Sequence, residues 1–198
     1  MTAGCNVGAH IAFPDLMGFG RHRMEIAAND LQDYCLYQIG AVQAFVRAAG
    51  ATLAHVKPHG ALYVMASSQE EVAAATAAAL ARIDQKLPLF LSNDECSAAV
   101  GESGITVAVE GFPDIVYTAA GSIIIEPQKV AWDPDLVARR ALRMVTEQRV
   151  SSTDPAVDVP LSVSTLCIHG DAPNAVQIAM RTRQVLEAAG VRIASLNS

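Results

Sequence analysis

Strand-like apolar runs alternate with helix-like segments along most of the chain, and this alternation limits the fold more than any other feature. Apolar runs typical of buried strands are found at residues 5–12, 53–56, 87–91, 105–109 and 163–168. Helical periodicity predicts helices at residues 24–49, 69–83, 94–100, 133–145 and 173–189. Successive βα units build a parallel sheet, either doubly wound or closed into a barrel.

Local signals refine these boundaries. Gly50 is expected to end the first long helix, and Asp133 to cap a helix that has Pro134 in its first turn. The irregular loop 113–134 reads as a hairpin or lid, because residues 117–125 contain Gly121 between two apolar runs, and residues 191–194 read as a candidate final strand.

Composition restricts the class of protein. The 198 residues suit one domain over 1–198, because 52% are hydrophobic and only 17% are charged. A net charge of -6, with 14 scattered Lys and Arg, argues against nucleic acid or an anionic membrane as the main partner. No signal peptide is visible and the alanine-rich stretch 72–81 is too short to span a bilayer, so we expect a cytoplasmic protein.

The cysteines fit the same compartment. They are far apart and have no CxxC spacing, so we expect reduced structural thiols rather than disulfides or a zinc site: Cys5, Cys35, Cys96 and Cys167.

Three histidines, His10, His59 and His169, each follow a short apolar run and lie beside or near a glycine. Functional residues at several strand ends favour the barrel over the doubly wound sheet, because loops at the carboxyl ends of parallel strands converge on one rim. We therefore predict that the three histidines share one active site. The alternative for each is a hydrogen-bonded core or turn residue.

The segment 55–63, HVKPHGALY, carries the sharpest signal. His55 and Lys57 are two residues apart and so share one face of a strand, while His59 and Gly60 open the next helix. A helix amino terminus beside a lysine suits an anionic oxygen. Alternatively, Lys57 extends to solvent and His59 only caps the helix.

The segments around the other two histidines are less specific. His10, Asp15 and Arg21 lie on a glycine-bearing loop that matches no complete phosphate-binding motif, so Asp15 also reads as a turn residue and Arg21 as a surface cation. His169 and Asp171 are close enough for acid–base work or metal binding. Asp171 also reads as the cap of the following helix.

Five segments, in order along the chain, resemble the LamB/YcsF family: GAHIAFPDLMGFGR, YQIGAVQAF, HVKPHGALY, EGFPD with Tyr117, and CIHGDAPNAV. The resemblance implies a distorted β/α barrel of the glycoside hydrolase/deacetylase type. It also implies ATP-dependent opening of 5-oxoproline to glutamate, together with 5-oxoprolinase subunits B and C.

The sequence departs from the family pattern in two places. Family members usually begin with an acidic strand and a loop similar to A-C-G-x-H-x-G-D; neither is present, so we expect a barrel that lacks its N-terminal strand or strands. Many members also have an arginine after Asp114, where this sequence has Ile115.

The implied activity assigns a hypothetical role to each candidate. The lactam oxygen is phosphorylated by ATP, with Mg²⁺ as its partner, and water then attacks the activated carbon. Lys57 and Arg21 would hold phosphate oxygens, and His59 and His169 would transfer protons. The remaining candidates would orient a histidine or line the substrate, phosphate or metal side: Asp171, His10, Asp15, His55 and Tyr63.

Two alternatives stay open. The first is a metal-dependent amidohydrolase or deacetylase, with His10, His59 and His169 as candidate ligands. The second is a truncated, non-catalytic subunit that stabilises its partners. The sequence leaves a homo-oligomer open as well.

Overall fold

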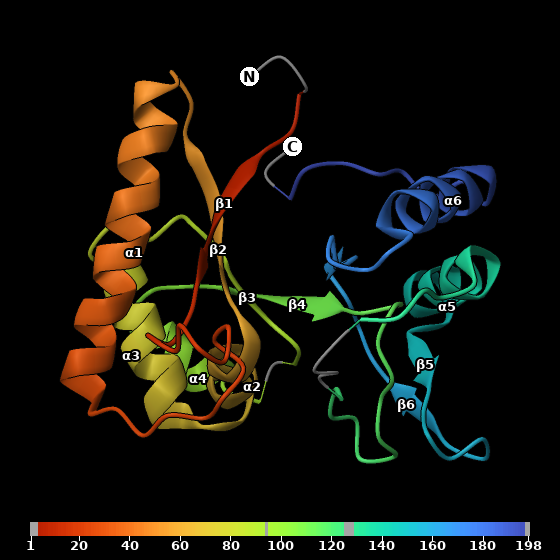
Figure 1. Ribbon diagram of the computed structural model, residues 1–198, viewed down its shortest axis with the longest axis horizontal. Coiled ribbons are helices and arrows are strands. Elements are labelled where there is room, and N and C mark those ends of the chain that lie inside the picture. The colour runs from red at the N-terminus through yellow and green to blue at the C-terminus, as the bar shows by residue number, and fades with distance from the viewer. Residues whose placement is uncertain (1–3, 94, 125–128, 197–198) are drawn as a thin grey trace. The chain divides into compact units, whose positions relative to one another are not determined.

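A computed structural model of the protein describes residues 4–93, 95–124 and 129–196. The chain divides into two compact units, Met1–Ala108 and Val109–Ser198 (Figure 1). The sequence predicts one domain over the whole chain, and that assignment stays a prediction.

The first unit is built from strands that alternate with helices. Its elements are β1 (Val7–Ile11), α1 (Ala28–Ala48), β2 (Leu53–Pro58), α2 (Gly60–Ser68), α3 (Glu70–Ala81), β3 (Leu89–Leu91), α4 (Ser97–Gly101) and the start of β4 (Val107–Gly111). β1 pairs in parallel with β2, which pairs in parallel with β3. The predicted strands and the long first helix are confirmed, although α1 begins at Ala28 rather than at residue 24.

The core of this unit lies between the strands and their helices. α1 buries Leu31, Cys35, Ile39 and Val46, whose spacing keeps them on one face of the helix. Figure 1 shows α1 and α3 side by side next to β1 and β2. Gly50 ends the helix as predicted, with a left-handed φ of 71° and a hydrogen bond from its N–H to the carbonyl oxygen of Arg47.

The second unit contains the end of β4 and the elements α5 (Pro134–Glu147), β5 (Arg149–Ser151), β6 (Asp158–Pro160), β7 (Thr165–Leu166) and α6 (Ala175–Ala188). β4 pairs in parallel with β7, and α5 packs against α6. The predicted start of α5 is confirmed, since the Asp133 carboxylate accepts a hydrogen bond from the N–H of Asp135 and Pro134 is the first helical residue.

Three details differ from the sequence-based expectations. β5 and β6 form an antiparallel pair that was not predicted, because strands of three residues are too short to show a period. Residues 191–194 are not a strand in the structure. The predicted hairpin at 117–125 reduces to a bridge between Tyr117 and Ile123, and its last residue lies outside the described part.

The division between the two units falls inside β4. The hydrogen-bonded strand order is β1-β2-β3-β4-β7. Parallel pairs joined through helices confirm the predicted α/β class. Within the described ranges, no helix combines the length and the hydropathy needed to cross a membrane.

Candidate functional site

The first unit brings two of the three histidines together. His10 lies near the end of β1 and His59 directly follows β2, and the parallel register sets His10 beside Lys57. Nε2 of His10 is 3.0 Å from Nδ1 of His59. The outer nitrogens face carbonyl oxygens: Nδ1 of His10 is 3.0 Å from the oxygen of Lys57, and Nε2 of His59 is 2.8 Å from that of Phe19.

These contacts limit how the two histidine rings can hydrogen-bond to each other. A carbonyl oxygen only accepts hydrogen bonds, so each outer nitrogen must carry a hydrogen. If both rings were neutral, the two inner nitrogens would then both be acceptors and could not bond to each other. A hydrogen bond across the 3.0 Å between His10 and His59 therefore forms when the pair holds one further proton, and with it one positive charge.

Lys57 and His55 lie on β2 beside this pair. The Lys57 ammonium lies 5.8 Å from the centre of the Tyr63 ring, within the range of a cation–π contact. The His55 ring stacks on Phe90 with centroids 4.3 Å apart. Burial lowers the pKa of His55, and the charge of Lys57 lowers it further, so His55 is held in its neutral form.

A glycine makes room for His55. A Cβ atom on Gly8 would lie 2.1 Å from the His55 ring, so no larger residue fits opposite this side chain. His55 is thus a packed residue of the strand.

The loop after β1 forms the other wall. Phe19 and Gly20 both have left-handed φ values, 55° and 72°, which are unusual for a phenylalanine. A Cβ on Gly60 would lie 2.4 Å from the Gly20 oxygen, so the loop touches the start of α2 backbone to backbone. The strained Phe19 residue supplies the carbonyl that His59 meets, and backbone strain of this kind gathers at functional sites.

Asp15 and Arg21 both make contacts within this loop. The Asp15 carboxylate accepts hydrogen bonds from the N–H groups of Gly18 and His22 and contacts the His22 ring. The N–H of His22, with the other bonds, holds the pKa of Asp15 below its usual value. The guanidinium of Arg21 lies 5.5 Å from the Phe19 ring centre. Asp15 is therefore the turn residue that the sequence offered as its alternative.

The second unit holds His169 against a buried carboxylate. The N–H of His169 donates to Oδ2 of Asp114 at 2.7 Å, and its ring Nδ1 is 3.1 Å from both carboxylate oxygens. The Asp114 side chain is 2% exposed and that of His169 27%. The His169 ring also stacks on Phe112, with centroids 5.7 Å apart.

The electrostatic balance at Asp114 favours the ionised form. Burial alone would raise the pKa of this carboxyl, but the hydrogen bonds and charge of His169 outweigh burial, and the charge of Lys129 adds to them. The pKa of Asp114 is therefore lowered below its usual value.

Arg140 on α5 holds the loop that carries Asp114. Its Nε donates to the carbonyl oxygen of Pro113 at 2.9 Å, and its Nη2 to that of Ile115 at 2.6 Å. The hydroxyl of Tyr117 accepts a hydrogen bond from the N–H of Phe112. The residues on both sides of Asp114 are thus fixed.

Sequence reasoning selected neither Asp114 nor Arg140 for the site. The available signal was a carboxylate between Phe112 and Ile115, an acidic residue in an apolar run, which is seldom buried without a partner. Sequence reasoning assigned the orienting role to Asp171, which is an exposed residue. In the structure, Asp114 is a carboxylate bonded to His169. The capping alternative for Asp171 is wrong, because α6 begins at Ala175 with Asn174 in the capping position.

The sequence predicted one site for all three histidines. The structure brings His10 and His59 together in the first unit and places His169 in the second, so the single site stays a prediction. Within the described residues, no group of three or more His, Cys, Asp or Glu side chains is arranged to hold a metal ion.

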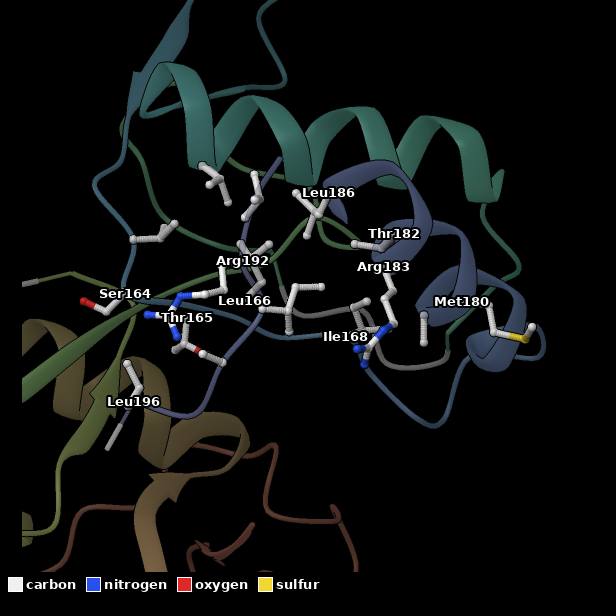
Figure 2. A pocket seen from close by; sticks show the side chains of 16 residues that line it. Ser164, Thr165, Leu166, Ile168, Met180, Thr182, Arg183, Leu186, Arg192 and Leu196 are labelled. Atoms are coloured by element: carbon white, nitrogen blue, oxygen red, sulfur yellow. The ribbon is translucent and has the colours of Figure 1, made fainter. Parts of the chain in front are cut away.

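The second unit also contains an apolar groove of about 610 Å³. Figure 2 shows Leu166 and Ile168 from the β7 region, Leu186 from α6 and the side chains of Arg183 and Arg192 around it. None of the candidate residues lines this groove, so its surface is separate from the His169 and Asp114 pair.

Comparison with known proteins finds relatives that match nearly the whole chain. The chain is 44% identical over 193 residues to the A subunit of 5-oxoprolinase from Thermus thermophilus, a match that covers 96% of this chain and 77% of the relative. It is 41% identical over 198 residues to the protein of the same name from Heliobacterium modesticaldum, covering 98% and 77%.

A solved structure is also similar. It is the lactam utilization protein from Thermus thermophilus, with a TM-score of 0.86 and 41% sequence identity, and the match covers 98% of this chain and 78% of that one. The model of the LamB/YcsF family matches residues 1–198. The chain therefore belongs to the LamB/YcsF family.

Proposed function

We propose that the protein takes part in the hydrolytic opening of a lactam, 5-oxoproline, to glutamate, coupled to ATP hydrolysis. We further propose that it acts as the A component of a complex with 5-oxoprolinase subunits B and C. The names of its relatives support the lactam and the multi-subunit assembly. An ATP-coupled reaction also suits the cytoplasm, where the sequence predicts the chain to be.

The observation that carries this proposal is the 3.0 Å contact between the rings of His10 and His59 beside Lys57. Opening a lactam breaks the bond between the carbonyl carbon and the ring nitrogen, and that nitrogen must gain a proton. A histidine pair that holds an extra proton is suited to be the acid for this step. Lys57 is suited to stabilise negative charge on a carbonyl or phosphate oxygen.

The residues present fit an anionic cofactor. Lys57, the charged histidine pair and the amino terminus of α2 at Gly60 all favour anionic oxygens, and Arg21 lies on the adjoining loop. ATP, when bound, would supply the phosphoryl group that activates the lactam oxygen, with Mg²⁺ as its usual partner. Lys57 and Arg21 would hold its phosphate oxygens, while His55 and Tyr63 would keep Lys57 in place.

The test is oxoproline-dependent ATP hydrolysis, and glutamate formation, by the protein combined with subunits B and C. Lys57→Ala and His59→Ala should each lower turnover by at least ~100-fold, the size expected for loss of an electrostatic or acid–base group. Lys86→Ala, at an exposed turn of the same unit, is the matched control and should keep full turnover. Unchanged oxoproline-dependent ATP hydrolysis in the His59 variant would contradict the proposal.

The same reconstitution separates the two alternatives. Stoichiometric metal, loss of activity with chelators and no need for ATP would identify a metal-dependent amidohydrolase. Assembly with the partners without any turnover would identify a non-catalytic component.

A further inference from the structure

We propose that Asp114 is a positioning residue that fixes the tautomer of His169, so that Nδ1 keeps its hydrogen and Nε2 is the nitrogen that accepts a proton. The effect on turnover rests on the proposed function, whereas the tautomer does not. The sequence offered Asp171 for this role, and we assign the role to Asp114 instead.

The contacts determine the tautomer. An ionised carboxylate only accepts hydrogen bonds, so a ring nitrogen 3.1 Å from both oxygens of Asp114 must be the donor. That nitrogen is Nδ1, and in a neutral imidazole the lone pair then belongs to Nε2. The bond from the His169 N–H to Oδ2 fixes the backbone to the same carboxylate.

The carboxylate has little freedom to move. Its side chain is 2% exposed, and Arg140 holds the carbonyl groups of Pro113 and Ile115 on either side of it. The stacked ring of Phe112 limits rotation of the His169 imidazole. A buried anion fixed at both ends can orient the imidazole and also stabilise the positive charge that the ring gains on taking a proton.

This arrangement suits a general base. Nε2 of His169 would take a proton from water as the water oxygen forms a bond to the lactam carbonyl carbon. The bond from that carbon to the ring nitrogen then breaks, the nitrogen receives a proton, and a second water hydrolyses the acyl phosphate that remains, so that the phosphoryl group leaves as phosphate. The imidazolium of His169 would be balanced by the Asp114 carboxylate until it releases the proton.

The first experiment reads the tautomer directly, by ¹⁵N NMR of the histidine rings in the full chain. The wild-type His169 should carry its hydrogen on Nδ1. In Asp114→Asn the amide oxygen can keep the bond to the His169 N–H while its NH₂ group faces Nδ1, so the hydrogen should move to Nε2. Asp135→Asn, which alters an exposed pair with Arg181 in the same unit, should leave the His169 signals unchanged.

Two results would overturn the proposal: a wild-type His169 with its hydrogen on Nε2, or an Asp114→Asn variant whose His169 tautomer is unchanged. The wild-type measurement decides the matter even if the variant does not fold.

The second experiment measures turnover in the complex with subunits B and C. Asp114→Asn should lower kcat by roughly 10²- to 10⁴-fold with little change in KM, as when an amide replaces the carboxylate behind a catalytic histidine. Asp114→Glu should recover part of the rate and shift its pH profile. Full kcat in a folded Asp114→Asn complex would contradict the positioning role.

The two experiments distinguish failure of the inference from failure of the proposed function. A wild-type complex without oxoproline-dependent turnover, but with the Nδ1 tautomer in His169, would reject the function and keep the tautomer assignment. Normal turnover with the other tautomer would do the opposite.

Discussion

His59 and His169 each follow a strand of the parallel sheet, yet their surroundings give the two imidazoles opposite properties. His59 contacts a second imidazole and a carbonyl oxygen, and a hydrogen bond between the two rings forms when the pair holds an extra proton. His169 contacts a buried carboxylate, which fixes the hydrogen on Nδ1. The same residue type after the same kind of element is therefore suited to donate a proton in one unit and to accept one in the other.

The two units also hold the backbone beside these histidines in similar ways. In the first, the Gln38 carboxamide from α1 bonds to both the N–H and the C=O of Ala12, each at 2.9 Å. In the second, Arg140 from α5 bonds to the carbonyl oxygens of Pro113 and Ile115. In each unit a polar side chain from the next long helix fixes the segment that follows a strand, but only Arg140 carries a charge.

The largest expected effect is that of Arg140→Ala. The substitution leaves two carbonyl groups of buried residues without their charged donor, so the free energy of unfolding should fall by about 3 kcal/mol. Arg139→Ala, an exposed neighbour on the same helix, should change it by less than about 0.5 kcal/mol. Urea unfolding of both variants provides the comparison, and equal midpoints would show that Arg140 does not stabilise the loop.

Gln38→Ala should have a smaller effect, because its two hydrogen bonds are between neutral groups. We expect a loss of about 1–2 kcal/mol in the free energy of unfolding, together with faster hydrogen exchange at Ala12. Arg47→Ala, an exposed residue in the last turn of the same helix, serves as the control. If Gln38→Ala lowered the free energy of unfolding as much as Arg140→Ala does, the charge of Arg140 would add nothing to how strongly it holds its loop.

The acid side of the stability curve should depend on Asp114. The pKa of Asp114 is lower in the folded protein than in the unfolded chain. The ionised carboxylate therefore stabilises the folded protein at any pH above the pKa of the unfolded chain, and this stability is lost as the pH falls through the pKa of the folded protein. As the pH falls below about 5, Asp114→Asn should flatten the dependence of the unfolding free energy on pH by at most about 1.4 kcal/mol per pH unit, the limit for one proton. Unfolding midpoints across this range measure the slope, and an unchanged slope would contradict the assignment.

The smallest expected effect is a gain. Gly40 lies inside α1, and a Cβ added there would meet no atom within 4 Å, so Gly40→Ala should stabilise the helix by about 0.5–1 kcal/mol. Gly8→Ala, which places a Cβ against the His55 ring, should destabilise the protein instead. Thermal unfolding should show shifts of opposite sign. Because Gly40→Ala leaves the Gln38 bonds intact, it separates helix stability from the fixing of Ala12.

Much of the fold was predictable from the sequence because the signals are local. The buried residues of α1 repeat with the helical period, Gly50 ends that helix, and Asp133 with Pro134 begins α5. The short strands β5 and β6 were not predicted, since three residues with one buried side chain carry no period and depend on each other for pairing.

The candidate site was predictable only in part. His10 and His59 follow neighbouring parallel strands, and the register that sets His10 beside Lys57 makes their meeting a consequence of the sheet. Asp114 is 55 residues from His169, and no local pattern connects the two. Proximity in sequence favoured Asp171, whose orienting role stays a prediction, and gave no sign of the bond between Asp114 and His169.

The sequence by itself determined the alternating elements, the glycines that allow close backbone contact and the histidines at strand ends, because periodicity and conformational freedom are properties of short segments. The tertiary structure alone decided which acceptor each imidazole faces, and therefore where its protons lie. A hydrogen bond depends on the position of two atoms to within a fraction of an ångström, and that position follows from strand register and from how Gln38 and Arg140 hold the loops.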